Sequence, residues 1–252
     1  MQLVDTHAHL EEIEDLEHAL TKARASSVIA IIAVGSDHKS NQKVLQLAQV
    51  YKGFVYAALG LHPWYIGDAE TDRCLDFIEA NIDKAVAIGE VGLDYHKRVR
   101  EQAEKDLQKS VLRKLLKIAN DHQKPALIHS RYAWQDALNL VTEAGIEKVV
   151  FHWYTGPSHT LLDIISHDYF LSATPAIEYH DEHRRAIKET PPKRLLLETD
   201  APVVYGRGRD FEYQSKPADV LRTIKSLTEL TGMSEARLAR TTTDNALRLF
   251  RL

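Results

Sequence analysis

The sequence has a single cysteine, Cys74, and no long run of apolar residues. One cysteine cannot form a disulfide within the chain, which excludes the class of small secreted proteins held together by disulfides. The longest apolar run, Val28 to Val34, is far shorter than the ~20 residues that cross a bilayer. The N-terminus also lacks the basic, apolar and small-residue regions of a secretory signal. We therefore expect an intracellular, cytoplasmic protein that does not bind membranes.

Charge of one sign is not in large excess either. The 32 lysine and arginine residues and 36 aspartate and glutamate residues give a formal net charge of −4. Without an overall positive field, a nucleic acid would have to be held locally, by basic residues at a rim or by metal ions. The 44% hydrophobic and 27% charged residues exclude disordered and low-complexity classes. The length of 252 residues suits one α/β barrel, so we expect a single domain over residues 1–252.

Short β-branched segments alternate along the chain with segments of helical period. In the first segment of helical period, apolar residues fall three or four positions apart, at Ile13, Leu16, Leu20 and Ala23. This alternation is typical of repeated βα units on a parallel sheet and predicts an α/β fold, a (β/α)8 TIM barrel with its site at the C-terminal ends of the strands. The predicted strands are Leu3–Leu10, Val28–Val34, Phe54–Leu61, Ala85–Leu93, Ala126–His129, Lys148–Trp153, Tyr169–Ala173 and Arg194–Thr199.

Histidine and carboxylate side chains recur at the predicted strand ends. His7 and His9 lie two residues apart on the first strand, so both imidazoles point the same way and can reach one ion. Four more candidates follow at later strands: Glu90, His129, His152 and Asp200. In a closed barrel these six side chains converge at the mouth with no basic residue among them. Because unpaired buried charges are costly, we predict a metal centre rather than six separate buried polar groups.

The residue types indicate which metals and which chemistry to expect. Mixed imidazole and carboxylate ligands suit transition metals, while magnesium prefers mostly oxygen. Six ligands exceed what one catalytic zinc needs, so we predict two divalent ions, with zinc, manganese and magnesium as candidates. Two ions about 4 Å apart can clamp both oxygens of a phosphodiester displacement and activate a water. Asp200 and Glu90 are the catalytic candidates; Asp200 is the natural general base, and a purely ligating role for it is an equal alternative.

The candidates lie in motifs that follow one another along the chain. These are Asp5-Thr6-His7-Ala8-His9, Gly60-Leu61-His62-Pro63, Gly89-Glu90-Val91-Gly92-Leu93-Asp94, Ile128-His129-Ser130-Arg131, His152 and Glu198-Thr199-Asp200-Ala201-Pro202. In this order they resemble the TatD family of metal-dependent hydrolases over nearly the whole chain. The resemblance implies a TIM barrel of the amidohydrolase superfamily, divalent-metal-dependent deoxyribonuclease activity, and ligand roles for all six candidates. Glu90 stands where many superfamily relatives carry a carbamylated lysine.

Loops after the strands supply candidates for substrate contact. His62 ends the third predicted strand, and the guanidinium groups of three arginines could bind phosphate. Aromatic residues in these loops could stack on unpaired bases, or they could simply pack in the fold. The alternative for the arginines is a solvated side chain, and the alternative for His62 is a hydrogen bond to the backbone. The arginines are Arg131, Arg207 and Arg209, and the aromatic residues are Trp153 and Tyr154, followed by Trp64, Tyr65 and Tyr205.

Three further side chains have weaker functional signals. Glu198 shares a strand face with Asp200, so it either orients a metal ligand from behind or packs inward with a bonded partner. His180 and His183 lie three residues apart on a predicted helix, with no third ligand on a strand end. We interpret these two histidines as part of a solvated helix face.

Three functions are compatible with these patterns. The first is a metal-dependent phosphodiesterase acting on DNA, as an exonuclease on single strands or ends, with endonuclease action left open. The second uses the same centre to hydrolyse an ester, lactone or amide, including removal of an acyl group from a nucleic acid carrier. A small closed apolar pocket favours the second, and an open mouth lined by arginine and aromatic residues favours the first. The third is a non-catalytic metal-binding scaffold, against which the complete ligand set argues.

Overall fold

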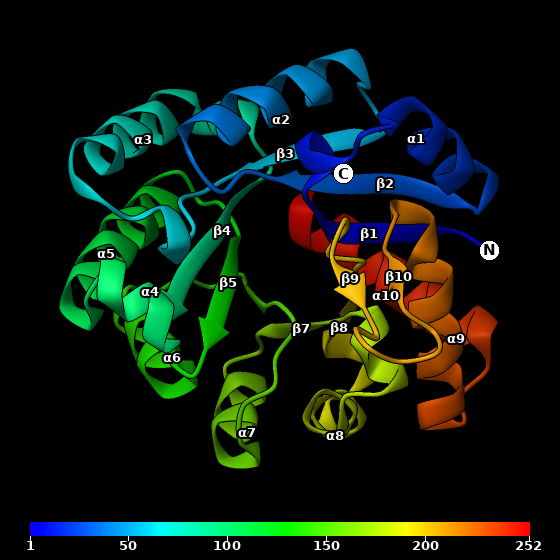
Figure 1. Cartoon of the computed structure of the whole chain (residues 1–252). Coiled ribbons are helices and arrows are strands. Elements are labelled where there is room, and N and C mark those ends of the chain that lie inside the picture. Colours follow the sequence, from blue (N-terminus) through cyan, green and yellow to red (C-terminus); the bar gives the residue numbers. More distant parts are fainter.

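The computed structural model arranges eight parallel strands in sequential order around a barrel, with helices outside it (Figure 1). It describes the backbone of residues 1–252 and the side chains of residues 1–67 and 70–252. This architecture confirms the predicted (β/α)8 TIM barrel. The barrel strands are β1 (Leu3–Ala8), β2 (Val28–Val34), β3 (Val55–Leu59), β4 (Ala87–Asp94), β5 (Ala126–Arg131), β6 (Val149–Phe151), β7 (Phe170–Ala173) and β8 (Leu195–Leu197).

The helices pack their apolar side against the strands. In α1, for example, Ala19, Leu20 and Ala23 are buried, and the Asp15 side chain caps the helix by accepting the backbone N–H of His18. The α-helices are α1 (Leu16–Ala25), α2 (His38–Val50), α3 (Asp68–Asn81), α4 (Lys97–Gln102), α5 (Lys105–Asp121), α6 (Trp134–Glu143), α7 (Ser158–Ser166), α8 (Asp181–Glu189), α9 (Val220–Thr231) and α10 (Glu235–Phe250). Within the described chain, none of them has the length and apolar character needed to span a membrane.

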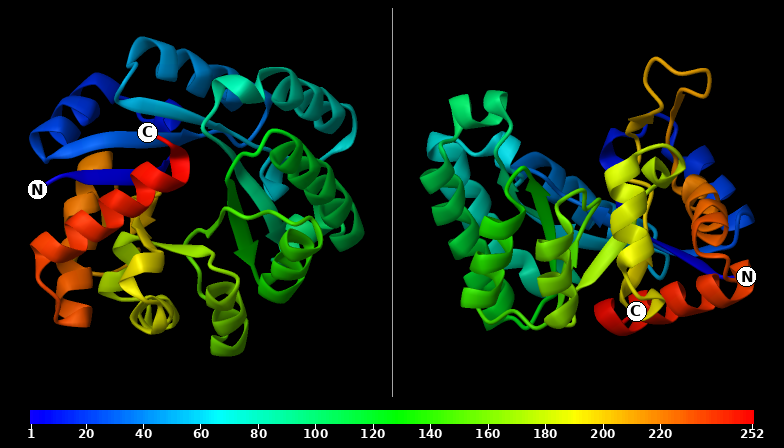
Figure 2. Two further views of the ribbon diagram at one scale, coloured as in Figure 1. Left: turned by 180° about the vertical axis from the view of Figure 1, so that it is seen from behind. Right: turned by 90° about the horizontal axis from the view of Figure 1, so that it is seen from below.

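Alternate strand residues build two apolar cores. Ile31 belongs to the core between the strands and the surrounding helices, whereas its neighbour Ile32 belongs to the core inside the barrel. The inner core continues into Leu249 and Phe250 of α10. Helix α10 thus closes the N-terminal end of the barrel, opposite the projecting hairpin of β9 (Val204–Tyr205) and β10 (Tyr213–Gln214) (Figure 2). The C-terminal strand ends stay available for a site.

Side-chain and backbone hydrogen bonds together close the barrel between β1 and the segment that follows β8. Strands β1 and β8 share no continuous ladder in the described structure, and one bridge joins Ala8 to Ala201. The buried carboxylate of Asp5 accepts the backbone N–H of Thr199 at 2.9 Å and its hydroxyl at 2.6 Å. Burial raises the pKa of Asp5 well above its usual range, although the Thr199 bonds work in the opposite direction. Asp5 therefore ties the last strand to the first directly before Asp200.

Several strand ends differ from the prediction. Strand β1 ends at Ala8 instead of Leu10, because residues 10–12 form a 3-10 turn. Strand β8 ends at Leu197 instead of Thr199, whose backbone N–H bonds to the Asp5 side chain. Strand β4 runs on to Asp94, so Glu90 lies inside the strand rather than at its end. The β4–β5 register slips between Ile88 and Val91, and such a bulge re-aims the side chain that it contains, here Glu90.

Candidate metal centre

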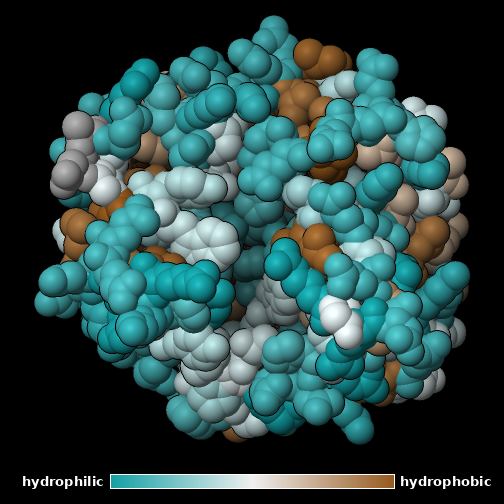
Figure 3. Space-filling model, in the orientation of Figure 1, coloured by the Kyte–Doolittle hydropathy of each residue, from teal (hydrophilic) through white to brown (hydrophobic). Residues whose placement is uncertain are grey.

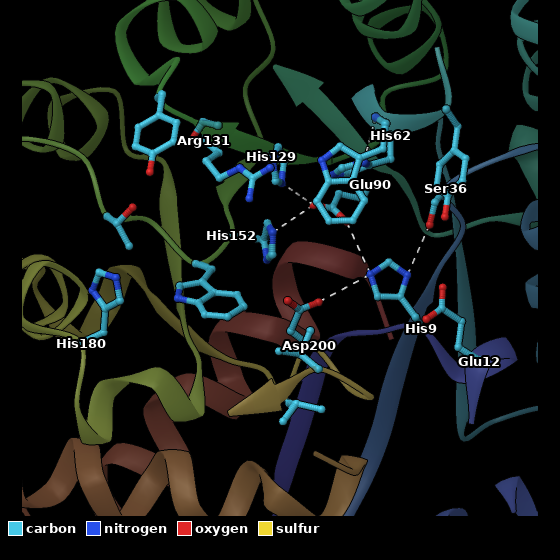
Figure 4. Close-up of a pocket in the computed structure, with 18 of the residues that line it drawn as sticks. His9, Glu12, Ser36, His62, Glu90, His129, Arg131, His152, His180 and Asp200 are labelled. Carbon is cyan, nitrogen blue, oxygen red and sulfur yellow. Dashed lines mark hydrogen bonds and ion pairs between the residues drawn. The ribbon is translucent and has the colours of Figure 1, made fainter. Parts of the chain in front are cut away.

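Four candidate ligand atoms, on His7, His9, Glu90 and Asp200, meet at the mouth of the barrel. Figure 4 labels three of these residues, His9, Glu90 and Asp200. The Nε2 atom of His7 lies 3.4 Å from Glu90 Oε2 and 3.6 Å from Asp200 Oδ1. The Nε2 atom of His9 lies 3.5 Å from each of the same two oxygens. Ligands about 2.1 Å from a tetrahedral ion would lie about 3.4 Å from one another. The spacing of these four atoms therefore suits one divalent ion.

The ring nitrogens of His7 support this interpretation. Both are buried, and neither has a hydrogen-bond partner among the described residues. Buried polar atoms are nearly always bonded, so an orphaned imidazole beside two carboxylates calls for an additional partner. A metal ion between His7, Glu90 and Asp200 would supply it. The residues present thus fit a metal site.

The other oxygen of Glu90 faces a second group of ligand atoms. Glu90 Oε1 lies 2.8 Å from His129 Nδ1 and 3.0 Å from His152 Nε2. Each imidazole has a carboxylate at its other nitrogen: Asp94 lies 3.2 Å from His129 Nε2, and Glu198 lies 3.2 Å from His152 Nδ1. Carboxylates in this position orient metal-binding histidines. Glu90 therefore divides its two oxygens between two sets of donors.

The charges of the site favour a bound cation. Burial raises the pKa of Glu90, but the surrounding imidazoles outweigh burial and hold that pKa well below its usual range. Burial also raises the pKa of Asp200, but the hydrogen bond to His9 and the nearby imidazoles outweigh burial and lower that pKa. Burial lowers the pKa of His9, but the bonds and charges of Asp200 and Glu90 raise it well above its usual value. Two buried carboxylates thus stay anionic beside histidines, which is the composition of a divalent-metal site.

Three residues at the mouth adopt a left-handed backbone that side chains other than glycine rarely take. Tyr132, Trp153 and Asp200 have φ angles of 57°, 41° and 48°. They follow β5, β6 and β8, so the unusual conformations lie at the C-terminal strand ends. Such conformations are costly and gather at functional sites. In Asp200 the conformation accompanies a backbone bond from its N–H to His7 O at 2.9 Å, which joins the two ligands.

A pocket of about 540 Å³ opens above the ligands. Figure 3 shows the same face as Figure 1, hollowed near its centre and surrounded mainly by hydrophilic side chains. Four of the predicted substrate contacts line this pocket: His62, Arg131, Arg207 and Trp153. Five of the ligand candidates also line it: His9, Glu90, His129, His152 and Asp200. Its other aromatic lining residues are Trp64, Tyr65, Tyr132 and Trp134.

Comparison with known proteins decides the family. The family model described as TatD related DNase matches residues 4–251. The chain belongs to the TatD family. It is 34% identical to the uncharacterized metal-dependent hydrolase YabD of Bacillus subtilis (strain 168), over 99% of both chains. It is 32% identical to deoxyribonuclease TATDN3 of Homo sapiens, over 98% of this chain and 94% of the human protein.

Two further relatives extend the comparison. The 3'-5' ssDNA/RNA exonuclease TatD of Pectobacterium carotovorum is 27% identical, over 95% of this chain and 94% of that protein. Among solved structures, YJJV, a TatD homologue from Escherichia coli K12, superposes with a TM-score of 0.88 at 27% identity, covering 99% of this chain and 98% of that one. The chain is thus a TatD-family metal-dependent hydrolase with relatives named as nucleases.

Three predicted substrate contacts of this TatD-family chain lie away from the pocket. Tyr154 is 1% exposed, and its hydroxyl donates to the carbonyl oxygen of Pro157 at 2.9 Å. Arg209 lies in the loop between β9 and β10, where its guanidinium carbon is 4.8 Å from the ring centroid of Tyr179. It does not line the pocket. Tyr205 is fully buried. The structure therefore does not bring these three side chains to the ligands.

His62 lies beside Glu90 and His129, and the ligand atoms of these three side chains are close enough to one another to hold an ion. Burial lowers the pKa of His62 to about 3, so its imidazole is neutral. Its Nδ1 accepts the backbone N–H of Trp64 at 3.2 Å, which puts the ring proton on Nε2. That Nε2 lies 3.6 Å from Glu90 Oε1. His62 thus presents a hydrogen-bond donor beside the metal ligands.

The prediction of a solvated face is wrong for His183. Its side chain is fully buried, its Nε2 accepts the backbone N–H of Thr174 at 3.1 Å, and its Nδ1 lies 3.0 Å from Tyr154 O. The sequence held a signal for this, because Ala186 and Ile187, three and four residues later, are also buried on the inner face of α8. His180 caps the start of α8 and lines the pocket.

Asp94 is the functional residue that the sequence reasoning missed. It is fully buried at the end of β4 and lies in the pattern Gly89 to Asp94, which was the available signal. Its carboxylate accepts the indole N–H of Trp64 at 2.7 Å and lies 2.8 Å from an Nη atom of Arg131. Together with the contact to His129, these bonds outweigh burial and lower the pKa of Asp94. One carboxylate thus contacts the metal-ligand candidate His129 and two residues of the pocket, Trp64 and Arg131.

Proposed function

We propose that this TatD-family hydrolase cleaves phosphodiester bonds in DNA, as an exonuclease on single strands or strand ends, with two divalent ions. The observation that carries the proposal is the position of Glu90. Its two carboxylate oxygens face two separate donor groups at the floor of a pocket that Arg131 and Arg207 line. Two metal positions next to guanidinium groups suit an anionic phosphodiester better than a neutral ester or amide.

The side chains of the pocket have distinct roles in this proposal. Ions held by the two donor groups would polarise a phosphoryl oxygen and lower the pKa of water. Asp200 lies among the donors and accepts the proton of the attacking water. His62 donates from Nε2 to a substrate oxygen, and Arg131 and Arg207 pair with phosphate groups. Trp153 also lines the pocket, and its ring stacks on a base of the DNA strand.

Preference for single strands and ends follows from the shape of the barrel. The pocket ends at the ligands, and the apolar inner core and α10 fill the barrel behind them. The end of a single DNA strand can enter such a closed recess more easily than a continuous duplex can. Two relatives support the substrate class by name, one as a deoxyribonuclease and one as a 3'-5' ssDNA/RNA exonuclease.

The alternatives predict different features at this mouth. Hydrolysis of a small ester, lactone or amide calls for a closed apolar pocket, whereas Arg131, Arg207 and several aromatic side chains line this one. A non-catalytic scaffold does not need the full ligand set. Each of the six ligand candidates belongs to at least one of three groups that could hold an ion, and among the described residues neither buried ring nitrogen of His7 has a hydrogen-bond partner. The features of the pocket therefore favour the nuclease.

The test is a time course on end-labelled single-stranded and duplex oligonucleotides. The protein is stripped of metal and then resupplied with magnesium, manganese or zinc. We expect a metal-dependent ladder that shortens the single strand from one end, and a large loss of turnover in Asp200→Asn. Asp76→Asn, which changes an exposed carboxylate on α3, is the matched control and keeps full activity. Absence of cleavage with every metal, together with hydrolysis of an acyl ester, would overturn the proposal in favour of the ester hydrolase.

A further inference from the structure

Trp64 is exposed and yet held in a fixed orientation. Its side chain is 48% exposed at the pocket rim. Its indole N–H donates to the fully buried Asp94 carboxylate at 2.7 Å, and its backbone carbonyl accepts from Gln102 Nε2 at 2.9 Å. A large aromatic ring stabilises a fold by being buried, so fixing a half-exposed ring brings the fold little benefit. The arrangement instead keeps an aromatic surface ready for a ligand.

The position of Trp64 relates this surface to the metal ligands. The ring centroids of Trp64 and His62 are 5.0 Å apart, and those of His62 and His129 are 4.4 Å apart. One side chain thus separates the indole from a metal ligand. A group stacked on Trp64 would lie next to whatever Glu90 and the ions hold. In the proposed reaction that is the scissile phosphate.

Arg131 also lies close to this indole. Its guanidinium carbon is 5.4 Å from the ring centroid of Trp64. Asp94 accepts from Arg131 Nε at 3.0 Å and lies 2.8 Å from one Nη atom, so the arginine is oriented by the carboxylate that also orients Trp64. A guanidinium carries five N–H donors, and these bonds use only some of them. The remaining donors, in a pocket-lining side chain, suit a phosphate.

We propose that Trp64 and Arg131 form a subsite for one unpaired nucleotide beside the scissile phosphate. The base stacks on the indole of Trp64, and a backbone phosphate pairs with Arg131. The proposal rests on the proposed function in that the substrate is a nucleic acid. It assigns the specificity for unpaired strands to Trp64, because a base within a duplex has both faces stacked already. Asp94 is the positioning residue for both side chains.

Two neighbouring aromatic side chains extend this surface along the rim. Tyr65 is 45% exposed and Tyr132 is 60% exposed, and both line the pocket. Large exposed aromatic side chains are uncommon on a protein surface, and here three of them share one pocket rim. Stacking on aromatic rings holds single strands without regard to sequence. The subsite therefore predicts dependence on the presence of a base and little dependence on its identity.

Binding of strands that lack one base tests the subsite directly. All proteins carry Asp200→Asn and are loaded with zinc, so that the strand is bound without being consumed. Dye-labelled oligothymidylates are compared by fluorescence anisotropy with strands in which one base-free position is moved along the chain. We expect the wild-type subsite to lose affinity by about 5- to 150-fold when the base-free position occupies it, which corresponds to 1–3 kcal/mol per stacked base.

Substitutions separate the roles of the two side chains. Trp64→Leu keeps an apolar side chain without a ring, and it should bind intact and base-free strands equally. Trp64→Phe keeps a ring and should retain most of the base dependence. Arg131→Gln should weaken binding of both strands by the same factor. Phe211→Leu, an exposed aromatic side chain in the hairpin loop outside the pocket, is the matched control and should keep the wild-type ratio.

Two results would overturn the subsite. One is a wild-type affinity that no base-free position changes; the other is a Trp64→Leu protein with normal metal content and the full wild-type base dependence. The base-free scan on unsubstituted Trp64 decides the question even where Trp64→Leu fails to fold. Base-dependent binding without any cleavage by the protein that retains Asp200 would overturn the nuclease and leave the subsite intact. Cleavage without base dependence would do the reverse.

Discussion

His183 makes the stability of the barrel depend on pH in a way that can be calculated. Its imidazole is fully buried between the loop that follows β6 and the end of β7. Its Nε2 accepts the N–H of Thr174, so the bond exists only while that nitrogen is unprotonated. Burial lowers the pKa of His183 from 6.5 to about 4. The folded state therefore requires the neutral imidazole, whereas the unfolded chain readily takes up a proton below pH 6.5.

The direction of the effect follows from proton binding. Above pH 6.5 both states hold the neutral imidazole, and the contribution of His183 to stability is fully present. As the pH falls from 6.5 toward 4, the unfolded state binds the proton first and the free energy of unfolding decreases. The two pKa values correspond to a loss of about 2 kcal/mol at pH 5 and about 3 kcal/mol at pH 4.

Urea unfolding of the wild type and of His183→Gln measures this loss. Glutamine can accept from Thr174 and donate to Tyr154 without titrating, so the variant lacks the pH-dependent term. Both proteins are unfolded between pH 7 and pH 4 with a chelator present, and titration of all shared groups cancels in their difference. We expect the stability advantage of the wild type to shrink by about 3 kcal/mol over this range. A difference that stays constant with pH would refute the buried neutral state of His183.

Two further substitutions test contacts around the centre. Glu198→Gln should weaken the affinity for the ion on the His152 side by about 10- to 100-fold, because the Glu198 carboxylate orients the His152 imidazole. A zinc competition titration measures this affinity, and an unchanged affinity would mean that Glu198 serves only in packing. Asp5→Ala should lower the free energy of unfolding by at least about 2 kcal/mol, since the buried N–H and hydroxyl of Thr199 lose their acceptor. Chemical denaturation measures this loss. An unchanged midpoint would mean that the Asp5–Thr199 bonds do not stabilise the closed barrel.

The strand-end pattern was sufficient to predict the barrel and the convergence of the ligands. A strand places alternate side chains on one face, so His7 and His9 had to point together, and their Nε2 atoms lie 3.4 Å and 3.5 Å from the same oxygen of Glu90. Parallel strands bring their C-terminal ends to one edge, which explains the meeting with His152 and Asp200. These relations depend on local periodicity and fold class alone.

Other features depend on contacts between distant parts of the chain, which periodicity does not report. Glu90 reaches the centre from inside β4 through a bulge. The nearby Gly89 and Gly92 are compatible with a bulge, but they do not determine where the register slips. Asp5 bonds to Thr199, 194 residues away, so the side-chain closure of the barrel follows only from the folded structure. Tyr154 shows the limit for single residues, since a position after a strand does not decide whether a ring faces the pocket or the core.

The bonds of Asp94 connect the proposed subsite to a candidate metal ligand. One carboxylate accepts from Trp64 and Arg131, which form the proposed subsite, and also lies 3.2 Å from Nε2 of the metal-ligand candidate His129. Because the carboxylate is fully buried, its partners cannot be exchanged for water without cost. If a nucleic acid strand drew Arg131 toward a phosphate, as the proposed subsite requires, Asp94 would lose one partner and its bond to His129 would change. The shared carboxylate is therefore the contact through which binding at the rim would affect the candidate ligands.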